Sequence, residues 1–183
     1  MSRLWVTGYR NYELSIFSDN DPKLKIIKNA LRRKLIEKIE SGTTWVIAGP
    51  QLGTEQWALE IASELKVEYP ELQTALMFPF AEFGKQWKDE KQEQLALLKA
   101  KVDFFANVSD NPYQNPQQLR NYQTFMLNHT DEALLLYDDE REGKTKFDLT
   151  AIQSFQENNS YNVETIDFYD LEEEATLYEE KNE

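Results

Sequence analysis

The chain has 183 residues, no cysteine, and 33 acidic against 20 basic residues, which gives a formal net charge of −13. A chain of this length with 40% hydrophobic and 13% aromatic residues is typical of one folded domain with a substantial core. The lack of cysteine excludes disulfides and thiol catalysis, and the acidity disfavours nucleic acid, because affinity for its phosphates comes from lysine and arginine. Since no apolar run approaches the roughly 18 residues of a membrane span, we expect a cytoplasmic protein that does not bind membranes.

Short apolar segments alternate with helical patterns along the whole chain. The expected strands are residues 4–7, 45–48, 74–78, 102–106 and 133–137, with a sixth over 163–168; the expected helices are 22–40, 54–68, 87–99, 116–128 and one through residues 147–155. Such alternation implies a parallel sheet covered by helices on both faces. We predict a single Rossmann-like three-layer α/β domain over residues 1–169, with a mostly parallel sheet of five to six strands.

Two regions carry uneven charge. Residues 170–183 hold seven acids and one lysine, and we expect an acidic C-terminal tail that is solvated and partly helical. Between Lys23 and Lys38 lie seven basic residues, on a helix whose opposite face is an apolar stripe. We favour a solvated basic face on a packed helix, with a docking surface for an acidic partner as the alternative.

Candidate binding residues follow from the fold, because ligands of parallel α/β sheets bind beyond the carboxyl ends of the strands. After the second strand, Gly49-Pro50-Gln51-Leu52-Gly53 leads into a helix, whose first N–H groups and dipole favour an anion such as phosphate. The alternative is that both glycines only make a tight turn. The candidate ligand-binding residues are Gly8, Tyr9, Arg10, Gly49, Gln51, Gly53, Thr54, Glu55, Trp87, Tyr137 and Asp138.

Two familiar phosphate motifs do not fit this chain. The turn lacks the G-x-G-x-x-G spacing of a dinucleotide fingerprint. Gly143-Lys144-Thr145 matches the end of a Walker A loop, but Asp138 replaces its first glycine and the intervening acids would repel phosphates. We interpret that match as accidental.

Four segments in order, VTGYR, GPQLGTEQWALEIA, FPF…QW and LLLYDDE, together resemble the YpsA-like family of Gram-positive bacteria. That family belongs to the superfamily that unites the DNA-processing protein DprA/Smf with the cytokinin-activating LOG enzymes. The resemblance spans residues 1 to about 169. It implies a Rossmann-like domain that binds a nucleotide or nucleotide-derived ligand, of the ADP-ribose or NAD type, with a link to cell division or stress responses.

The resemblance also bears on catalysis. LOG enzymes carry P-G-G-x-G-T-x-x-E, whose glutamate helps to cleave the bond between base and ribose; Trp57 stands at that position here. We therefore favour a non-enzymatic sensor, in which Gly53→Ala weakens binding more than folding. The alternative is a nucleotide hydrolase with Glu55 or Asp138 as base.

The cofactor is left unknown, and no metal site is expected from one histidine and no cysteine. The expected partners are a nucleotide-derived small molecule and a protein that receives the bound state, with self-association left open. Nucleic acid and membranes are not expected partners.

Overall fold

The apolar segments pair edge to edge as a six-stranded parallel sheet. The computed structural model describes residues 2–182. Its strands are β1 (Ser2–Gly8), β2 (Thr43–Ala48), β3 (Gln73–Phe78), β4 (Phe104–Asn107), β5 (Glu132–Leu136) and β6 (Asn162–Ile166), in the spatial order β4-β3-β2-β1-β5-β6. All five expected strands and the sixth are present.

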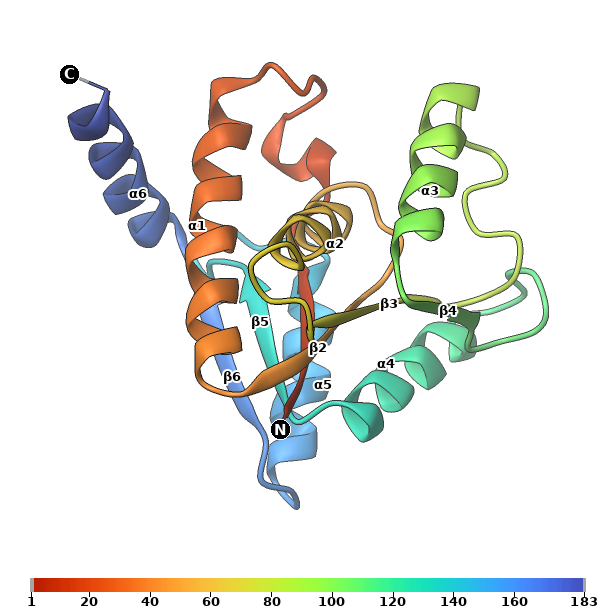
Figure 1. The fold of residues 1–183 in the computed structure, drawn as a ribbon. Helices are drawn as coiled ribbons and strands as arrows, with labels where there is room; N and C mark the ends of the chain where they lie inside the picture. The colour runs from red at the N-terminus through yellow and green to blue at the C-terminus, as the bar shows by residue number, and fades with distance from the viewer. Residues whose placement is uncertain (1, 183) are drawn as a thin grey trace.

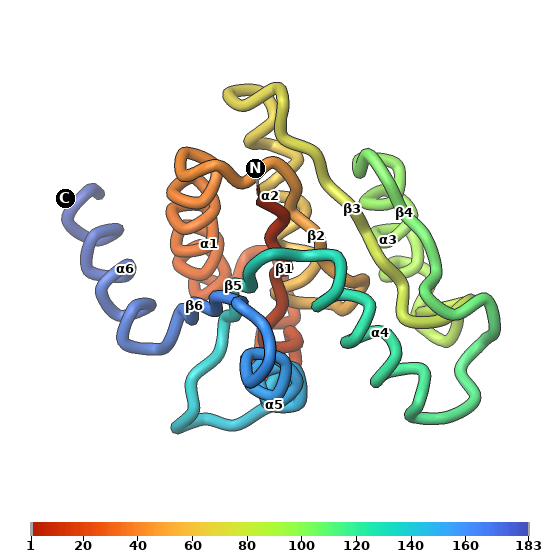
Figure 2. The backbone as a smooth tube through the Cα atoms, turned by 90° about the horizontal axis from the view of Figure 1, so that it is seen from below, coloured from red at the N-terminus to blue at the C-terminus, as the bar shows by residue number. Residues whose placement is uncertain are grey.

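Helices cover both faces of the sheet and complete the three layers (Figure 1). On one face lie α1 (Pro22–Glu40), α2 (Thr54–Leu65), α3 (Asp89–Lys101) and α6 (Phe168–Lys181). On the other lie α4 (Gln117–His129) and α5 (Thr145–Gln156), which are nearest the viewer when the molecule is seen from below (Figure 2). The predicted Rossmann-like α/β fold is confirmed. The sequence did not reveal the short 3₁₀ helix Asn11–Leu14 after β1.

Helix α1 begins and ends where its sequence signals place it. The carboxylate of Asp21 accepts a hydrogen bond from the backbone N–H of Lys23 at 2.9 Å, and Pro22 occupies the first helical position. Beyond the helix, Gly42 has a φ of 116°, which favours glycine. The buried residues of the helix are Leu24, Ile27, Ala30, Leu31 and Leu35, so the apolar stripe packs into the core.

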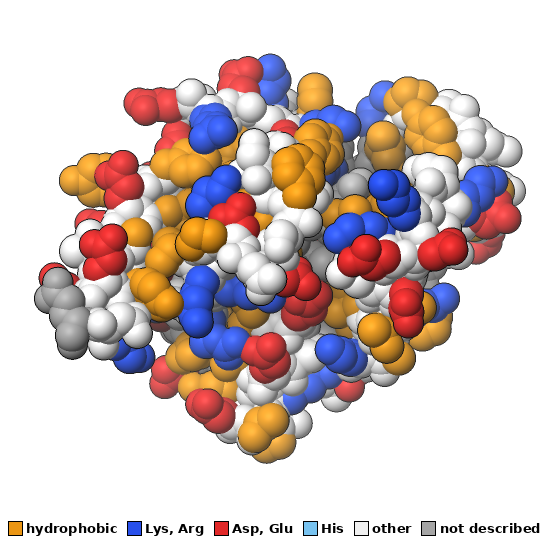
Figure 3. All heavy atoms as spheres, turned by 90° about the horizontal axis from the view of Figure 1, so that it is seen from above, with side chains coloured by type: hydrophobic (Ala, Val, Ile, Leu, Met, Phe, Trp, Pro, Cys, Tyr) orange, Lys and Arg blue, Asp and Glu red, His pale blue; other side chains and the backbone are white. Residues whose placement is uncertain are grey.

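The basic residues of α1 are neutralised by acids of the same chain. The ion pairs are Lys23–Asp21, Lys28–Glu60, Arg32–Glu64, Arg33–Glu174, Lys34–Glu164 and Lys38–Glu132. The remaining one, Lys25, has its Nζ 5.8 Å from the centroid of the Tyr178 ring. On the face of the molecule that is seen from above, acidic and basic side chains are likewise interspersed (Figure 3). Because most basic residues of α1 already pair with acids of this chain, the structure favours a solvated face on this helix over a docking surface for an acidic partner.

The acidic C-terminal segment is largely helical. Asp167 caps α6, and its carboxylate accepts from the N–H of Asp170 at 2.9 Å. Glu174 is 6% exposed and accepts two hydrogen bonds from the Arg33 guanidinium, at 2.9 and 3.0 Å. One side of α6 is thereby held against α1.

Two expected boundaries shift for local reasons. Helix α3 begins at Asp89, because the preceding residues form turns in which Trp87 packs edge-on against Phe83 at 5.4 Å between ring centroids. Strand β4 begins at Phe104, after Asp103, whose carboxylate accepts from the N–H of Thr74. Within residues 2–182, none of the helices combines the length and apolarity that crossing a membrane requires.

Candidate functional site

The order of the strands places a crevice at the carboxyl end of β1. From β1 the chain moves outward through β2, β3 and β4, then returns to the other side of β1 to form β5 and β6. The connections that leave β1 and β5 therefore go to opposite faces of the sheet, which opens the crevice in which such folds bind ligands. The turn from β2 to α2 lies beside it.

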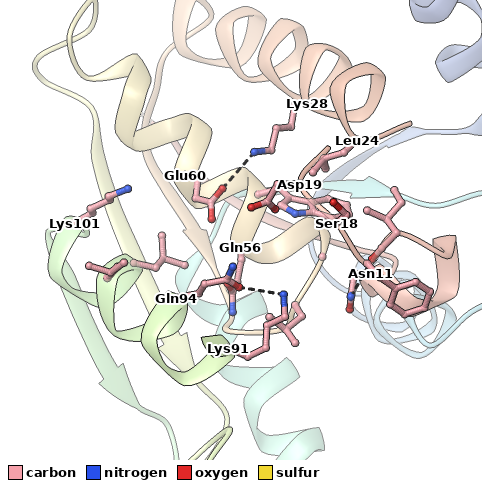
Figure 4. Close-up of a pocket in the computed structure, with 17 residues that line it drawn as sticks. Asn11, Ser18, Asp19, Leu24, Lys28, Gln56, Glu60, Lys91, Gln94 and Lys101 are labelled. Atoms are coloured by element: carbon pink, nitrogen blue, oxygen red, sulfur yellow. Dashed lines mark hydrogen bonds and ion pairs between the residues drawn. The ribbon is translucent and has the colours of Figure 1, made fainter. Parts of the chain in front are cut away.

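This turn separates two pockets. Pro50, Gln51 and Glu55 face a cleft of about 690 Å³ bounded by α4 and α5, which we call the α4–α5 cleft. Leu52 and Gly53 face a smaller pocket of about 270 Å³ between α1, α2 and α3, the α1–α3 pocket (Figure 4).

The α4–α5 cleft combines apolar walls with a polar floor. Its apolar lining comprises Trp5, Pro50, Pro79, Pro116, Leu119, Phe147 and Ala151. Its polar and charged lining comprises Arg10, Gln51, Glu55, Tyr122, Gln123, Asp148, Thr150 and Ser154, with Arg120 and Lys144 exposed at the mouth. Its size falls within the range of small-molecule sites, roughly 300–1,000 Å³.

Glu55, in the first turn of α2, supplies a carboxylate to the floor. The residue is 5% exposed, and its Oε2 accepts a hydrogen bond from Thr7 Oγ1 at 2.8 Å. Its Oε1 accepts from the backbone N–H of Gln51 at 3.1 Å. A Cβ atom at Gly49 would collide with Glu55 Oε1 and would lie 2.6 Å from Tyr122 Oη. Gly49 therefore makes room for both polar groups.

Asp148, on α5, is the second acid of the cleft. Its Oδ1 accepts a hydrogen bond from Gln123 Nε2 of α4 at 2.9 Å. Burial raises the pKa of this carboxyl to about 6, and the charge of Glu55 adds to the rise, while Gln123, Arg10 and Thr7 oppose it. Asp148 therefore changes charge just below neutral pH, in the same cleft as Glu55.

Two buried polar atoms of the cleft residues lack a hydrogen-bond partner among residues 2–182. They are Nη1 of Arg10 and Oη of Tyr122. Burial, together with the charges of Glu55 and Asp148, raises the pKa of Tyr122 well above its usual value, so its hydroxyl remains a donor. Buried polar atoms are nearly always paired in proteins, so these two atoms make the α4–α5 cleft the candidate site.

Several polar side chains of the α1–α3 pocket are paired within the chain. Lys28 and Glu60 form an ion pair at 3.6 Å, and Lys91 Nζ donates to Gln94 Oε1 at 3.4 Å (Figure 4). On its floor, Gln56 Nε2 donates to the carbonyl of Pro50 at 2.8 Å.

Gly53 and Thr54 are engaged with the segment that follows β1. Gly53 has a φ of 119° and forms a backbone bridge with Arg10. The N–H of Thr54 donates to the carbonyl oxygen of Tyr9 at 3.1 Å, and its hydroxyl donates to the same oxygen at 2.9 Å. One of the N–H groups expected to meet a phosphate is thus used within the chain, and neither residue lines the α4–α5 cleft.

The structure brings Arg10, Gln51 and Glu55 together in the cleft, with Gly49 behind them, and leaves the other expected residues outside its lining. Gly8 packs against Leu136 and Thr54. Tyr9 packs against Tyr137, with ring centroids 5.4 Å apart and ring planes inclined at 40°, and burial raises the pKa of Tyr9 to about 12.

The carboxylate of Asp138 accepts from the N–H groups of Phe168 and Glu140. Gly84 and Phe83 surround Trp87.

Sequence reasoning missed the polar residues Thr7, Tyr122, Gln123 and Asp148 of the site, and the cations Arg120 and Lys144 of its lining. Thr7 is the last residue of its expected strand and not one of the residues after it, Lys144 directly precedes α5, and the other four lie inside α4 and α5. One signal was available, because Asp148 is an acid between Phe147 and Leu149 in an apolar stretch.

The fold and the cleft together define a Rossmann-like α/β protein with a built pocket at the switch in strand order. The chain belongs to the YspA SLOG family, whose model matches residues 4–171. This confirms the resemblance seen in the sequence.

Several relatives match the chain over nearly all of its length. It is 85% identical to a UPF0398 protein of Pediococcus pentosaceus, with 100% of each chain covered. It is 57% identical to a UPF0398 protein of Limosilactobacillus reuteri, over 99% of this chain and 96% of the relative. A UPF0398 protein of Levilactobacillus brevis is 53% identical, over 100% of this chain and 96% of the relative.

Proposed function

We propose that this protein binds a nucleotide or nucleotide-derived ligand in the α4–α5 cleft, beside the turn that follows β2. The observation that carries the proposal is the pair of buried donors, Arg10 Nη1 and Tyr122 Oη, that have no partner within residues 2–182. Leaving such groups unpaired costs roughly 1–3 kcal/mol each, a cost that a bound ligand with acceptor atoms removes.

The shape and chemistry of the cleft fit the base and sugar of a nucleotide. Trp5, Leu119 and Phe147 offer apolar surface to a planar base. Glu55 offers a buried carboxylate, the group with which Rossmann-like proteins commonly accept hydrogen bonds from ribose hydroxyls. In this proposal the bound state is passed to a protein partner in cell-division or stress physiology, as the family resemblance implies.

The test is a binding screen with a matched pair of variants. Purified protein is screened by thermal shift, then calorimetry, against ADP-ribose, NAD, AMP, cyclic nucleotides and cytokinin ribotides. Glu55→Gln should weaken the binding of any hit by about tenfold or more, because the charged acceptor is lost. Glu60→Gln, five residues along the same helix but facing the α1–α3 pocket, should leave affinity unchanged.

Two results would contradict the proposal. One is that no compound of this panel binds. The other is that Glu60→Gln weakens binding as much as Glu55→Gln, since the ligand would then lie in the α1–α3 pocket.

A second candidate, a nucleotide hydrolase, is favoured by the presence of two acids in one cleft. Glycosidic hydrolysis uses one carboxylate and one protonated carboxyl group, and Glu55 and Asp148 have environments of those two kinds. Water would add across the bond between base and ribose, with Asp148 protonating the departing base. Asp138, whose carboxylate accepts two backbone N–H groups, does not line this cleft.

Between these candidates we favour binding without turnover. Trp57, at the position of the LOG glutamate, is 8% exposed and packs in the core, so it supplies no acid–base group. Incubation with AMP, followed by chromatography for released adenine, should show none. Release of adenine that Glu55→Gln abolishes would establish the hydrolase instead.

A further inference from the structure

The charges around the α4–α5 cleft are arranged by depth. Acids lie on the floor, where Glu55 is 5% exposed and Asp148 is desolvated enough to raise its pKa. Cations lie at the mouth, where Arg120 comes from α4 and Lys144 from the residue before α5. A ligand that spans this depth meets opposite electrostatic environments at its two ends.

The cations at the mouth differ from those of α1. On α1, every basic residue but Lys25 has an acid within 4.0 Å. Within residues 2–182, neither the Arg120 guanidinium nor Lys144 Nζ has an acid at that distance, and the carboxylate of Glu13 accepts from the backbone N–H of Lys144 at 3.0 Å. Arg120 donates from Nε and Nη2 to the neutral Oε1 of Gln117, at 3.1 and 2.9 Å, and Lys144 Nζ lies 5.7 Å from the centroid of the Tyr12 ring. In a chain of net charge −13, these two positive charges are left available to an external anion.

The floor is a poor place for such an anion. A phosphate beside the Glu55 carboxylate would be repelled at low dielectric, and ionised Asp148 would add to the repulsion. The single cation of the floor, Arg10, does not outweigh both acids. The floor suits hydroxyl groups and heteroatoms, which donate to Glu55 and accept from Tyr122 and Arg10.

The turn after β2 does not offer the phosphate an alternative position in this cleft. The N–H of Thr54 donates to the carbonyl of Tyr9, and that of Gln51 donates to Glu55. Gly53 faces the α1–α3 pocket.

From this arrangement we propose that the cleft takes a nucleoside 5′-phosphate with its nucleoside inward and its phosphate at the mouth, held by Arg120 and Lys144. The inference rests on the proposed function and adds an orientation to it. The phosphate is recognised by two side chains from the α4–α5 face, not by the glycine turn and helix dipole at the start of α2.

The experiment compares nucleosides with their 5′-monophosphates by calorimetry. Adenosine, guanosine, cytidine and uridine, each with its monophosphate, are titrated into the wild type, the double variant Arg120→Gln/Lys144→Gln, and a control. The control, Lys25→Gln/Lys146→Gln, removes the same net charge at residues that do not line the cleft. Thermal melts establish that all three proteins are folded.

For at least one base, we expect the monophosphate to bind the wild type at least tenfold more tightly than its nucleoside. That advantage should fall to less than threefold in Arg120→Gln/Lys144→Gln, while nucleoside affinity stays unchanged, and it should persist in the control. It should also shrink from 50 to 300 mM salt, because contacts at the exposed mouth are screened.

The outcomes separate this inference from the proposed function. If no nucleoside or monophosphate binds the wild type, the inference fails, and the proposed function fails with it only if ADP-ribose, NAD and the other compounds of the wider screen do not bind either. If a monophosphate binds but its advantage survives in the double variant, or is absent from the wild type, the orientation is wrong and the proposed function stands. An equal loss in the control would show that net charge, not these two side chains, is responsible, which also overturns the inference.

Discussion

The α4–α5 cleft and the α1–α3 pocket flank the same turn, yet they satisfy their polar groups differently. In the α1–α3 pocket, Lys28 pairs with Glu60 and Gln56 donates to a backbone carbonyl (Figure 4). In the cleft, two buried donors have no partner within residues 2–182, on Arg10 and Tyr122. The difference teaches that the state of the buried polar atoms, more than the presence of a glycine turn, distinguishes the two sides of this turn.

The two sides arise from the periodicity of α2. Residues four apart share a face of a helix, so Gln56 and Glu60 point into the α1–α3 pocket. Glu55 lies one position before Gln56, so its side chain is rotated from that of Gln56 by about 100° around the helix axis and faces the cleft. The ion-paired acid Glu60 and the buried acid Glu55 thus lie on different faces of the same helix.

The largest effect we predict is on the stability of the turn. Gly53→Ala should lower the free energy of unfolding by about 4 kcal/mol, from backbone strain and steric overlap combined. Gly53 has a φ of 119°, and an added Cβ would lie 2.6 Å from the backbone nitrogen of Asn11 and 2.7 Å from the carbonyl oxygen of Tyr9. Urea unfolding measures the loss.

Gly42→Ala is the matched control for this variant. Gly42 has a similar φ of 116°, but an added Cβ meets nothing within 4 Å among the described residues. Gly42→Ala should therefore lower the free energy of unfolding only through backbone strain, by about 1–2 kcal/mol. Equal losses of stability in the two variants would show that the close contacts around Gly53 do not add to the cost of the substitution. A loss of ligand affinity without a loss of stability in Gly53→Ala would restore the sequence-based expectation that this glycine approaches the ligand.

The second prediction concerns Asp148 and pH. Its pKa is about 6 in the folded protein, against about 4 in an unfolded chain, so the native state binds more protons between those values. Stability should therefore fall as the pH rises from 4 to 7, by up to about 3 kcal/mol for this one group. Asp148→Asn, which keeps an oxygen to accept from Gln123, should remove that fall and be more stable than the wild type at pH 7.

Urea unfolding from pH 4 to pH 8 measures this effect in both proteins. Asp131→Asn is a suitable control, because Asp131 is an exposed acid that pairs with Arg3 at the amino-terminal end of the sheet. Parallel pH profiles for the wild type and Asp148→Asn would refute the raised pKa.

Most of the fold was predictable because its signals are local. Apolar runs mark the strands, and Asp21-Pro22 and Gly42 mark the two ends of α1. The amphipathic spacing of the helices was equally visible. The helix of residues 168–181 was only partly foreseen, since its hold on α1 depends on Arg33 meeting Glu174, 141 residues away in sequence.

The candidate site was less predictable, because half of it comes from helix interiors. The rule that ligands bind beyond the carboxyl ends of the strands predicted Arg10, Gln51 and Glu55 as candidate site residues. It could not lead to Tyr122 or Asp148, which reach the cleft only when α4 and α5 pack side by side beneath the sheet (Figure 2). Nor does spacing alone show which side of the β2–α2 turn each residue faces.

The smallest predicted effect tests the α1–α3 pocket directly. Lys28→Met should change the free energy of unfolding by less than about 1 kcal/mol, because Lys28 and Glu60 are each 36% exposed and exposed pairs contribute little. It should also leave AMP affinity unchanged, since the residue lies outside the α4–α5 cleft. Arg10→Met removes one cation in the same way but inside the cleft, and should weaken AMP binding about tenfold. Calorimetry on both variants decides which pocket the ligand occupies. If Lys28→Met weakens AMP binding more than Arg10→Met does, the ligand lies in the α1–α3 pocket and not in the α4–α5 cleft.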